Sequence, residues 1–249
     1  MSGHRGRTLD VYVELVRMQI VKTAGVIGGV GPETTAEFYL EVLFGCYARN
    51  KTQRPPMLIW NIPLPYQVEQ DLLLHAKGEE RYVPYLQEAA RLLEKGGADF
   101  LVMPCNTLHL FIKEIRSAVQ IPVLSILEET GKFLTDSGAR RIGILATPAL
   151  LQKNLYGTIL ESVGIQQIAP DAFEEAKIGK MINNIVLNRH ANKDRDALLR
   201  VINHFEQKDV DTVILACTDL QLLIPHHPRL KIYDTMKIFA DATVDFILN

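Results

Sequence analysis

Residues 212–222 read TVILACTDLQL, an apolar run that ends in a cysteine and is followed by small polar residues. A short apolar run without alternation is typical of a strand buried on both faces, as in a parallel sheet covered by helices. Residues 100–110, FLVMPCNTLHL, repeat the pattern, again with a cysteine where the strand should end. The two stretches predict an α/β fold with one cysteine at a strand end in each half.

The rest of the chain alternates in the same way between predicted strands and predicted helices. Strands separated by helices predict parallel sheets with helices on both faces. The strands are expected at residues 21–28, 57–61, 99–103, 121–125, 141–146, 166–168, 211–216 and 231–233. The helices are expected from about 34, at 81–95, after 106, at 128–136, from 148, at 174–187, at 193–207 and from 236.

The two halves of the chain resemble each other. TAGVIGGVGP at 23–32 corresponds to RRIGILATPA at 140–149, so Gly25 and Gly143 lie 143 − 25 = 118 positions apart. Cys105 and Cys217 lie at nearly the same offset, 217 − 105 = 112. A shared offset indicates an internal duplication. We therefore expect two pseudosymmetric doubly wound domains with parallel-stranded sheets and an active-site cleft between them.

The first domain is expected at residues 22–126 and the second at 127–234, with a C-terminal helix at 235–249 that packs back on the first. Residues 1–21 are expected to be a poorly ordered N-terminal extension. Their apolar stretch is short and contains Asp10 and Glu14, so it predicts neither a signal peptide nor a membrane span.

Composition limits the partners of the protein. The 249 residues carry a formal net charge of −2, which favours neither nucleic acid nor an anionic membrane as a partner. The three cysteines form no CxxC pair and no secreted disulfide pattern, so a reducing cytoplasm is expected and no metal site is predicted. His226 and His227 are flanked by prolines and are interpreted as part of a solvated loop.

Cys105 and Cys217 are the candidate catalytic residues. Ligands of open α/β sheets bind beyond the carboxyl ends of the strands, where both cysteines are predicted. If the halves are related by a pseudo-twofold axis, the two thiols face each other across the cleft. A helix that begins after each cysteine would lower a thiol pKa that is ordinarily about 8.5. One thiolate and one thiol are what a two-base proton exchange requires.

Other reactive residues have weaker cases. Cys46, inside a predicted helix, is interpreted as a small buried hydrophobe. His109 lies one helical turn after Cys105, and it either assists thiolate formation or stiffens the turn. GGVGPET at 28–34 is only a partial dinucleotide motif, and its glycines are interpreted as a tight turn whose amides bind a carboxylate.

Three stretches resemble the signature sequences of the aspartate/glutamate racemase superfamily, in particular its aspartate racemase and broad-specificity amino-acid racemase branch. They are GGVGPETTAEFY at 28–39, MPCNTLH at 103–109 and ACTDLQ at 216–221. The resemblance covers the chain from residue 22 to 249. It implies a homodimeric enzyme that racemises aspartate or glutamate without a cofactor, with Cys105 and Cys217 as the two acid–base residues.

The resemblance also implies a set of substrate-binding residues. These are Gly29, Val30, Gly31, Gln70, Asn106, Thr107, Leu108, Thr147, Lys177 and Thr218. The chain departs from the family pattern at several positions. The aspartate-specific branch has an arginine near Gln70, and the family usually has Glu where this chain has Asp219. The lysine expected in the FEEAKIGKM stretch is either Lys177 or missing, and the glycine-threonine pair usual after Thr147 is absent. Loss of an arginine clamp removes a charged hydrogen bond of about 1.5–3 kcal/mol, enough to change which substrate is preferred.

Two alternatives use the same residues differently. The cysteine pair could serve an isomerase or decarboxylase of a dicarboxylate, in which one sulfur attacks carbon or delivers a proton. The chain could also be a noncatalytic amino-acid-binding relative that keeps the cleft. A product assay with a panel of dicarboxylates separates racemisation from the first alternative, and tight amino-acid binding without hydrogen exchange would favour the second.

Overall fold

The computed structural model describes residues 21–50, 53–75, 77–223 and 227–249. Most of the expected N-terminal extension, residues 1–20, and His226 lie outside these ranges. Two parallel sheets are present among the described residues, as predicted. The first has the order β2-β1-β3, with β1 (Ala24–Gly28), β2 (Met57–Asn61) and β3 (Phe100–Val102). The second has the order β5-β4-β6-β7, with β4 (Arg141–Leu145), β5 (Gln166–Ile168), β6 (Thr212–Leu215) and β7 (Lys231–Asp234).

The predicted strand at 121–125 is wrong in extent. The segment makes a single parallel bridge, Leu101 with Val123, beside β3. The amides of Gln120 and Ile121 instead donate to the Glu94 carboxylate, and Ser125 caps the next helix, so no ladder can extend in either direction. This bridge nevertheless occupies the position in the first sheet that β7 holds in the second. The strand order is therefore the same in both halves.

Helices connect the strands and cover both faces of each sheet. The longer ones among the described residues are α2 (Pro32–Arg49), α3 (Tyr66–His75), α4 (Val83–Lys95), α6 (Ile126–Asp136), α9 (Ala172–Val186), α10 (Asn192–Glu206) and α11 (Thr235–Leu248). The short ones are α5 (Ile112–Arg116), α7 (Pro148–Gln152) and α8 (Gly157–Ser162), with the 3-10 helices η1 (Glu79–Tyr82), η2 (Thr107–Phe111) and η3 (Thr218–Leu223).

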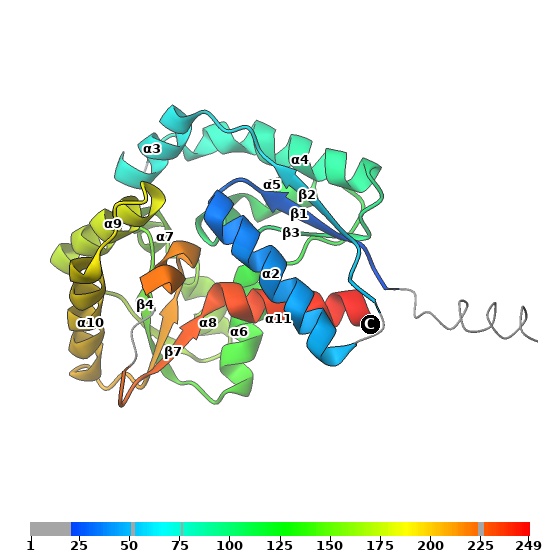
Figure 1. Ribbon diagram of the computed structural model, residues 1–249. Coiled ribbons are helices and arrows are strands. Elements are labelled where there is room, and N and C mark those ends of the chain that lie inside the picture. Colours follow the sequence, from blue (N-terminus) through cyan, green and yellow to red (C-terminus); the bar gives the residue numbers. More distant parts are fainter. Residues whose placement is uncertain (1–20, 51–52, 76, 224–226) are drawn as a thin grey trace, which may run out of the picture.

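The inner faces of the two sheets share one hydrophobic core. This core joins Val26 of the first sheet and Ile144 of the second through residues of α2, α6 and α11. Phe38 of α2 and Phe239 of α11 lie with their rings 5.7 Å apart. In Figure 1, α11 (red) leaves the second sheet and runs beneath the first sheet alongside α2 (blue). The outer faces have separate cores, under α4 in one half and under α9 and α10 in the other.

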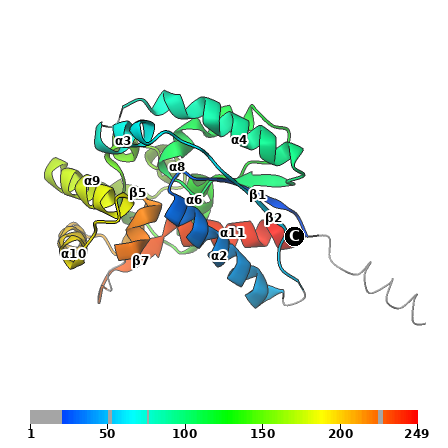
Figure 2. The same ribbon diagram turned by 45° about the horizontal axis from the view of Figure 1, so that its top comes forward.

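The halves exchange helices reciprocally. The helix that follows β7, α11, packs against α2 of the first half, and α6, which follows the Val123 bridge, packs against α8 of the second. Figure 2 shows α2, α6 and α11 gathered in the middle of the molecule. The exchange joins the two halves, so that the carboxyl ends of β3 and β6 are held in one arrangement.

Candidate active site

Each candidate cysteine follows a parallel strand, β3 in the first sheet and β6 in the second. Cys105 comes three residues after β3, in a tight turn in which its amide donates to the Met103 carbonyl at 2.8 Å. Cys217 comes two residues after β6, and its carbonyl accepts from the Leu220 amide at 3.0 Å. Both positions lie beyond the carboxyl ends of parallel strands, where α/β sheets bind ligands.

One pocket lies between the halves and is lined by both cysteines. The two cysteines are close enough that negative charge on Cys105 raises the pKa of Cys217. Most of the predicted substrate-binding residues line the same pocket. They are Val30, Gly31, Asn106, Thr107, Leu108, Thr147 and Thr218.

Three predicted substrate-binding residues do not line this pocket. Gly29 forms the turn before α2, where it has φ +82° and donates its amide to Thr35 Oγ1 at 3.1 Å. Gln70 is exposed on α3. Lys177 lies on α9 with Nζ 4.0 Å from the Phe173 ring, on a different surface of the molecule. Successive residues of a helix differ by about 100° in direction, so α3 turns the neighbouring Glu69 toward the pocket instead of Gln70.

The environment of Cys105 contradicts the expectation of a lowered pKa. Burial raises the pKa of the Cys105 thiol to about 12, although the amides of Leu108 and Thr107 favour the thiolate, and nearby Asp219 adds to the increase. The following element, η2, is a 3-10 helix of 5 residues, whose dipole is weak compared with that of a long α-helix. Desolvation therefore has a larger effect on the pKa of Cys105 than the neighbouring amides have.

The Cys217 thiol is hydrogen-bonded to a carboxylate. Its thiol donates to Asp219 Oδ2 at 3.6 Å, and Asp219 Oδ1 accepts from Thr34 Oγ1 of the opposite half at 2.9 Å. Burial and the adjacent Asp219 charge raise the pKa of Cys217 well above its usual value. Burial also raises the pKa of Asp219. The pair is thus a thiol with a proton acceptor already in contact.

Asn106 positions the Cys105 loop through its side chain. Its Nδ2 donates to Thr235 Oγ1 at 2.9 Å, and its Oδ1 accepts from the Tyr156 hydroxyl at 2.6 Å. The next residue also contacts the second half, since the hydroxyls of Thr107 and Thr147 lie 2.9 Å apart. These bonds fasten the first-half loop to the second half beside the pocket.

His109 has a structural role. Its Nε2 accepts from the Ile126 amide at 3.1 Å, so Nδ1 carries the proton and donates to the Cys105 carbonyl at 2.8 Å. Burial lowers the pKa of His109 to about 4, which keeps the ring neutral. The sequence left two interpretations of His109 open, and the structure supports the one in which His109 stiffens the turn.

Six pocket residues were not in the predicted site: the polar Glu69, Tyr82 and Asp219, and the apolar Leu72, Ala149 and Val186. The helical spacing of buried Val68 and Leu72 indicates which face of α3 is inward and could have identified Glu69. Asp219 follows its cysteine by two positions, a spacing that also brings it to the sulfur. Tyr82 has no comparable signal, because only the tertiary fold places it near Cys105.

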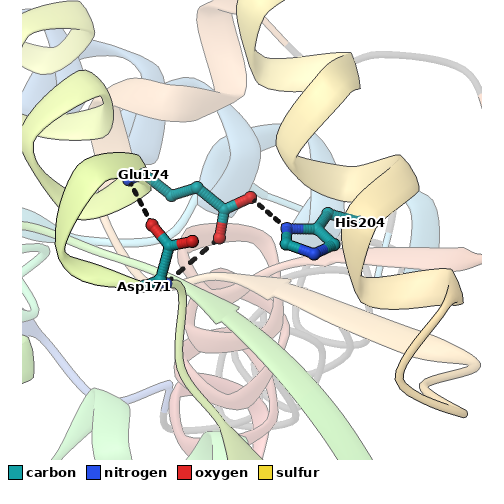
Figure 3. A group of neighbouring side chains, drawn as sticks. All are labelled: Asp171, Glu174 and His204. Carbon is teal, nitrogen blue, oxygen red and sulfur yellow. Dashed lines mark hydrogen bonds and ion pairs between the residues drawn. The ribbon is translucent and has the colours of Figure 1, made fainter.

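A separate cluster of possible metal ligands lies at the start of α9. Figure 3 shows Asp171, Glu174 and His204 side by side. Their polar atoms already bond to one another and to the backbone: Asp171 and Glu174 form a capping box, and His204 Nδ1 lies 2.7 Å from Glu174 Oε1. Lys177 and Arg200 line the same hollow and disfavour a bound cation. We interpret the cluster as a helix cap.

No helix in the described ranges is both long enough and apolar enough to cross a membrane.

Known proteins with related sequences and structures are racemases. A family model described as Asp/Glu/Hydantoin racemase matches residues 27–243. The broad specificity amino-acid racemase RacX of Bacillus subtilis (strain 168) is 29% identical over 231 residues, covering 90% of this chain and 97% of its own length. The glutamate racemase of Aquifex aeolicus (strain VF5) is 28% identical over 193 residues, 70% of this chain and 68% of its own.

Solved structures agree with this assignment. A candidate Asp/Glu racemase from Yersinia pestis superposes with a TM-score of 0.80 at 27% identity, over 92% of this chain and 100% of that one. PH1733, an aspartate racemase homologue from Pyrococcus horikoshii OT3, has the same fold, with a TM-score of 0.75 at 24% identity over 92% and 100% of the two chains. With its pocket and paired cysteines, the chain belongs to the Asp/Glu/Hydantoin racemase family, and it is an enzyme of the isomerase class.

Proposed function

We propose that this protein is a cofactor-independent amino-acid racemase in which Cys105 and Cys217 exchange protons with the α-carbon from opposite faces. The observation that carries the proposal is the shared pocket. The two cysteines follow equivalent strands of the two halves and line one space between them. A proton can therefore be removed on one side and replaced on the other, which inverts the carbon.

Because the pKa values of both thiols are raised, we propose that the bound substrate helps to form the thiolate. Burial raises the pKa of both thiols and so favours their protonated forms. The α-ammonium of a bound amino acid adds a positive charge beside the sulfurs and stabilises a thiolate. Asp219 is in place to accept the proton of Cys217, and the amides of Thr107 and Leu108 stabilise a thiolate at Cys105. In each direction one thiolate takes the α-proton and becomes a thiol, and the opposite thiol gives its proton to the carbon.

The substrate carboxylate must be stabilised while the α-carbon carries negative charge. The pocket offers the hydroxyls of Thr107, Thr147 and Thr218, together with the backbone of the turn at Val30 and Gly31. Preorganised donors of this kind are usually the largest electrostatic contribution to such reactions. Aspartate and glutamate, named by the relatives and by the resemblance, are the first substrates to assay.

The proposal is tested by incubating enzyme and amino acids in deuterium oxide and following loss of the α-proton signal by NMR. We expect deuterium in both enantiomers, and loss of at least about 1000-fold in rate for Cys105→Ala and for Cys217→Ala. Cys46→Ala is the matched control, because Cys46 is buried in α2 away from the pocket. A single pocket variant with full activity would reject the two-base scheme.

We further propose that the enzyme is a cytoplasmic homodimer. The described cysteines are all free, which suits a reducing compartment. Leu40, Phe44 and Tyr47 form an exposed apolar stripe along α2, a surface suited to a second copy. Sedimentation of the purified protein measures the oligomeric state directly, and a monomer at working concentration would contradict the proposal.

A further inference from the structure

The charged side chains that line the pocket are all acidic among the described residues. Two of its lining residues, Glu69 and Asp219, carry carboxylates, and no lysine, arginine or histidine lines it among the described residues. A substrate with an acidic side chain would add a third carboxylate to this group without any cation to balance it. Like charges at short range are destabilising.

Asp219 and Glu69 differ in how far their carboxylates are already engaged. Asp219 is bonded to Thr34 and to the Cys217 thiol. Glu69 has no hydrogen bond or ion pair with any described residue, although it is half-buried at the pocket. Its pKa is raised by burial, and then by the charges of Asp219 and Glu33. The groups around Glu69 are therefore negative.

Two basic side chains close to this part of the structure, Arg81 and Lys153, pair with other carboxylates. Arg81, on the segment that follows α3, pairs with Asp71. Lys153 pairs with Glu79 on the far side of Leu72. Within the described ranges neither Arg81 nor Lys153 pairs with Glu69, so its carboxylate is available to a cation that enters the pocket.

The end of α9 adds to the negative potential. Its last residue, Val186, lines the pocket, and α9 packs against α3 across the two halves. The carboxyl end of a helix carries partial negative charge and attracts cations. The last turn of α9 contains no lysine, arginine or histidine. Glu69 and this helix end thus face the same space.

From this geometry we infer that the pocket selects amino acids with a positively charged side chain, and that Glu69 is the residue that pairs with that charge. The inference rests on the proposed racemase function. The α-ammonium of the substrate is placed beside Asp219 and the sulfurs, and the side-chain cation extends toward Glu69 and the end of α9. Lysine, ornithine and arginine have this chemistry.

The test is a panel of lysine, ornithine, arginine, alanine, methionine, aspartate and glutamate, assayed for α-proton exchange in deuterium oxide and for binding by calorimetry. We expect kcat/KM for the basic amino acids to exceed that for aspartate and glutamate by at least tenfold. Glu69→Gln should lower kcat/KM about 10- to 100-fold for the basic amino acids only, since it removes one charged hydrogen bond. Glu69→Lys should shift preference toward aspartate and glutamate.

Glu80→Gln is the matched control, because Glu80 is an exposed acid of the same half that does not line the pocket. Equal or better use of acidic substrates by the unaltered enzyme would overturn the inference while leaving racemisation intact. Tight binding of basic amino acids without any exchange would instead refute the racemase proposal and support the charge assignment. An enzyme that neither binds nor exchanges any member of the panel would overturn both.

Discussion

At the scale of single residues, the site combines two thiols with a buried carboxylate. Asp219 lies against one thiol and is held in place by Thr34 from the other half. A charge buried there raises the pKa of Cys217, so it opposes a free thiolate while offering a place for the proton. We interpret Asp219 as the immediate proton acceptor of Cys217.

The substitution Asp219→Asn tests this role. Asparagine keeps an oxygen for Thr34 but accepts no proton, so racemisation should fall about 100-fold or more. The free energy of unfolding should change by less than about 1 kcal/mol, because the hydrogen bond is kept and a buried charge is removed. Urea denaturation and kinetics measure the two effects, with exposed Asp136→Asn as control. Full activity in Asp219→Asn would contradict the assignment.

The pH profile depends on the same pKa values. A thiol whose pKa is raised to about 12, as for Cys105, is protonated throughout the neutral range and loses its proton only as pH rises. We therefore expect kcat/KM to increase steadily from pH 7 to 9 instead of reaching a plateau. Initial rates across that range provide the measurement. A plateau that begins below pH 7 would mean that a thiolate already exists in the free enzyme.

At the scale of secondary-structure elements, the loop after β3 is anchored by helices of the other half. The Asn106 side chain joins it to Tyr156 at the start of α8 and to Thr235 at the start of α11. Both ends of the Asn106 amide are buried and bonded, so the position of Cys105 depends on elements 50 and 129 residues away.

Tyr156→Phe removes one of these bonds and leaves the Asn106 carbonyl without that donor. We expect the free energy of unfolding to fall by about 1–3 kcal/mol, the cost of an unsatisfied buried polar group. Racemisation should also fall, since the Cys105 loop loses a fixed contact. Tyr66→Phe, at a side chain that is 82% exposed, serves as the control for urea titration. Unchanged stability in Tyr156→Phe would show that the bond contributes little.

At the scale of the whole molecule, the two halves do not have independent cores. The inner faces of both sheets pack on α2, α6 and α11, and helices are exchanged in both directions. A half separated from its partner would expose the surface that its exchanged helix now covers. The pocket between the halves is consequently formed by a single cooperative structure.

We predict one thermal unfolding transition for the full chain, with calorimetric and van't Hoff enthalpies in agreement. Phe239→Ala removes a fully buried ring from the shared core. It should lower the free energy of unfolding by about 3–5 kcal/mol, and the variant should still unfold in a single transition. Differential scanning calorimetry makes both measurements. Two separable transitions in the unaltered protein would show that the halves unfold independently.

The local sequence determined much of this protein. Buried apolar runs predicted the parallel sheets, because a strand depends on side chains close together in the chain. The near-equal offsets of the glycines and of the cysteines predicted the duplication, because a repeat can be read from the order of the residues alone. The strand predicted at 121–125 is shorter in the structure because the amides of Gln120 and Ile121 donate to the Glu94 side chain. The apolar pattern of the segment does not reveal this contact.

Only the tertiary structure decided the state of the site. The positions of Cys105 and Cys217 at strand ends predicted that both lie beside one pocket. Their raised pKa values follow instead from burial and from Asp219. Asp219 accepts a hydrogen bond from Thr34, 185 positions away in the chain. The inward direction of Glu69 and the exposure of Gln70 likewise depend on how α3 docks against α9. Desolvation and charge act through space, so contacts between distant segments set them.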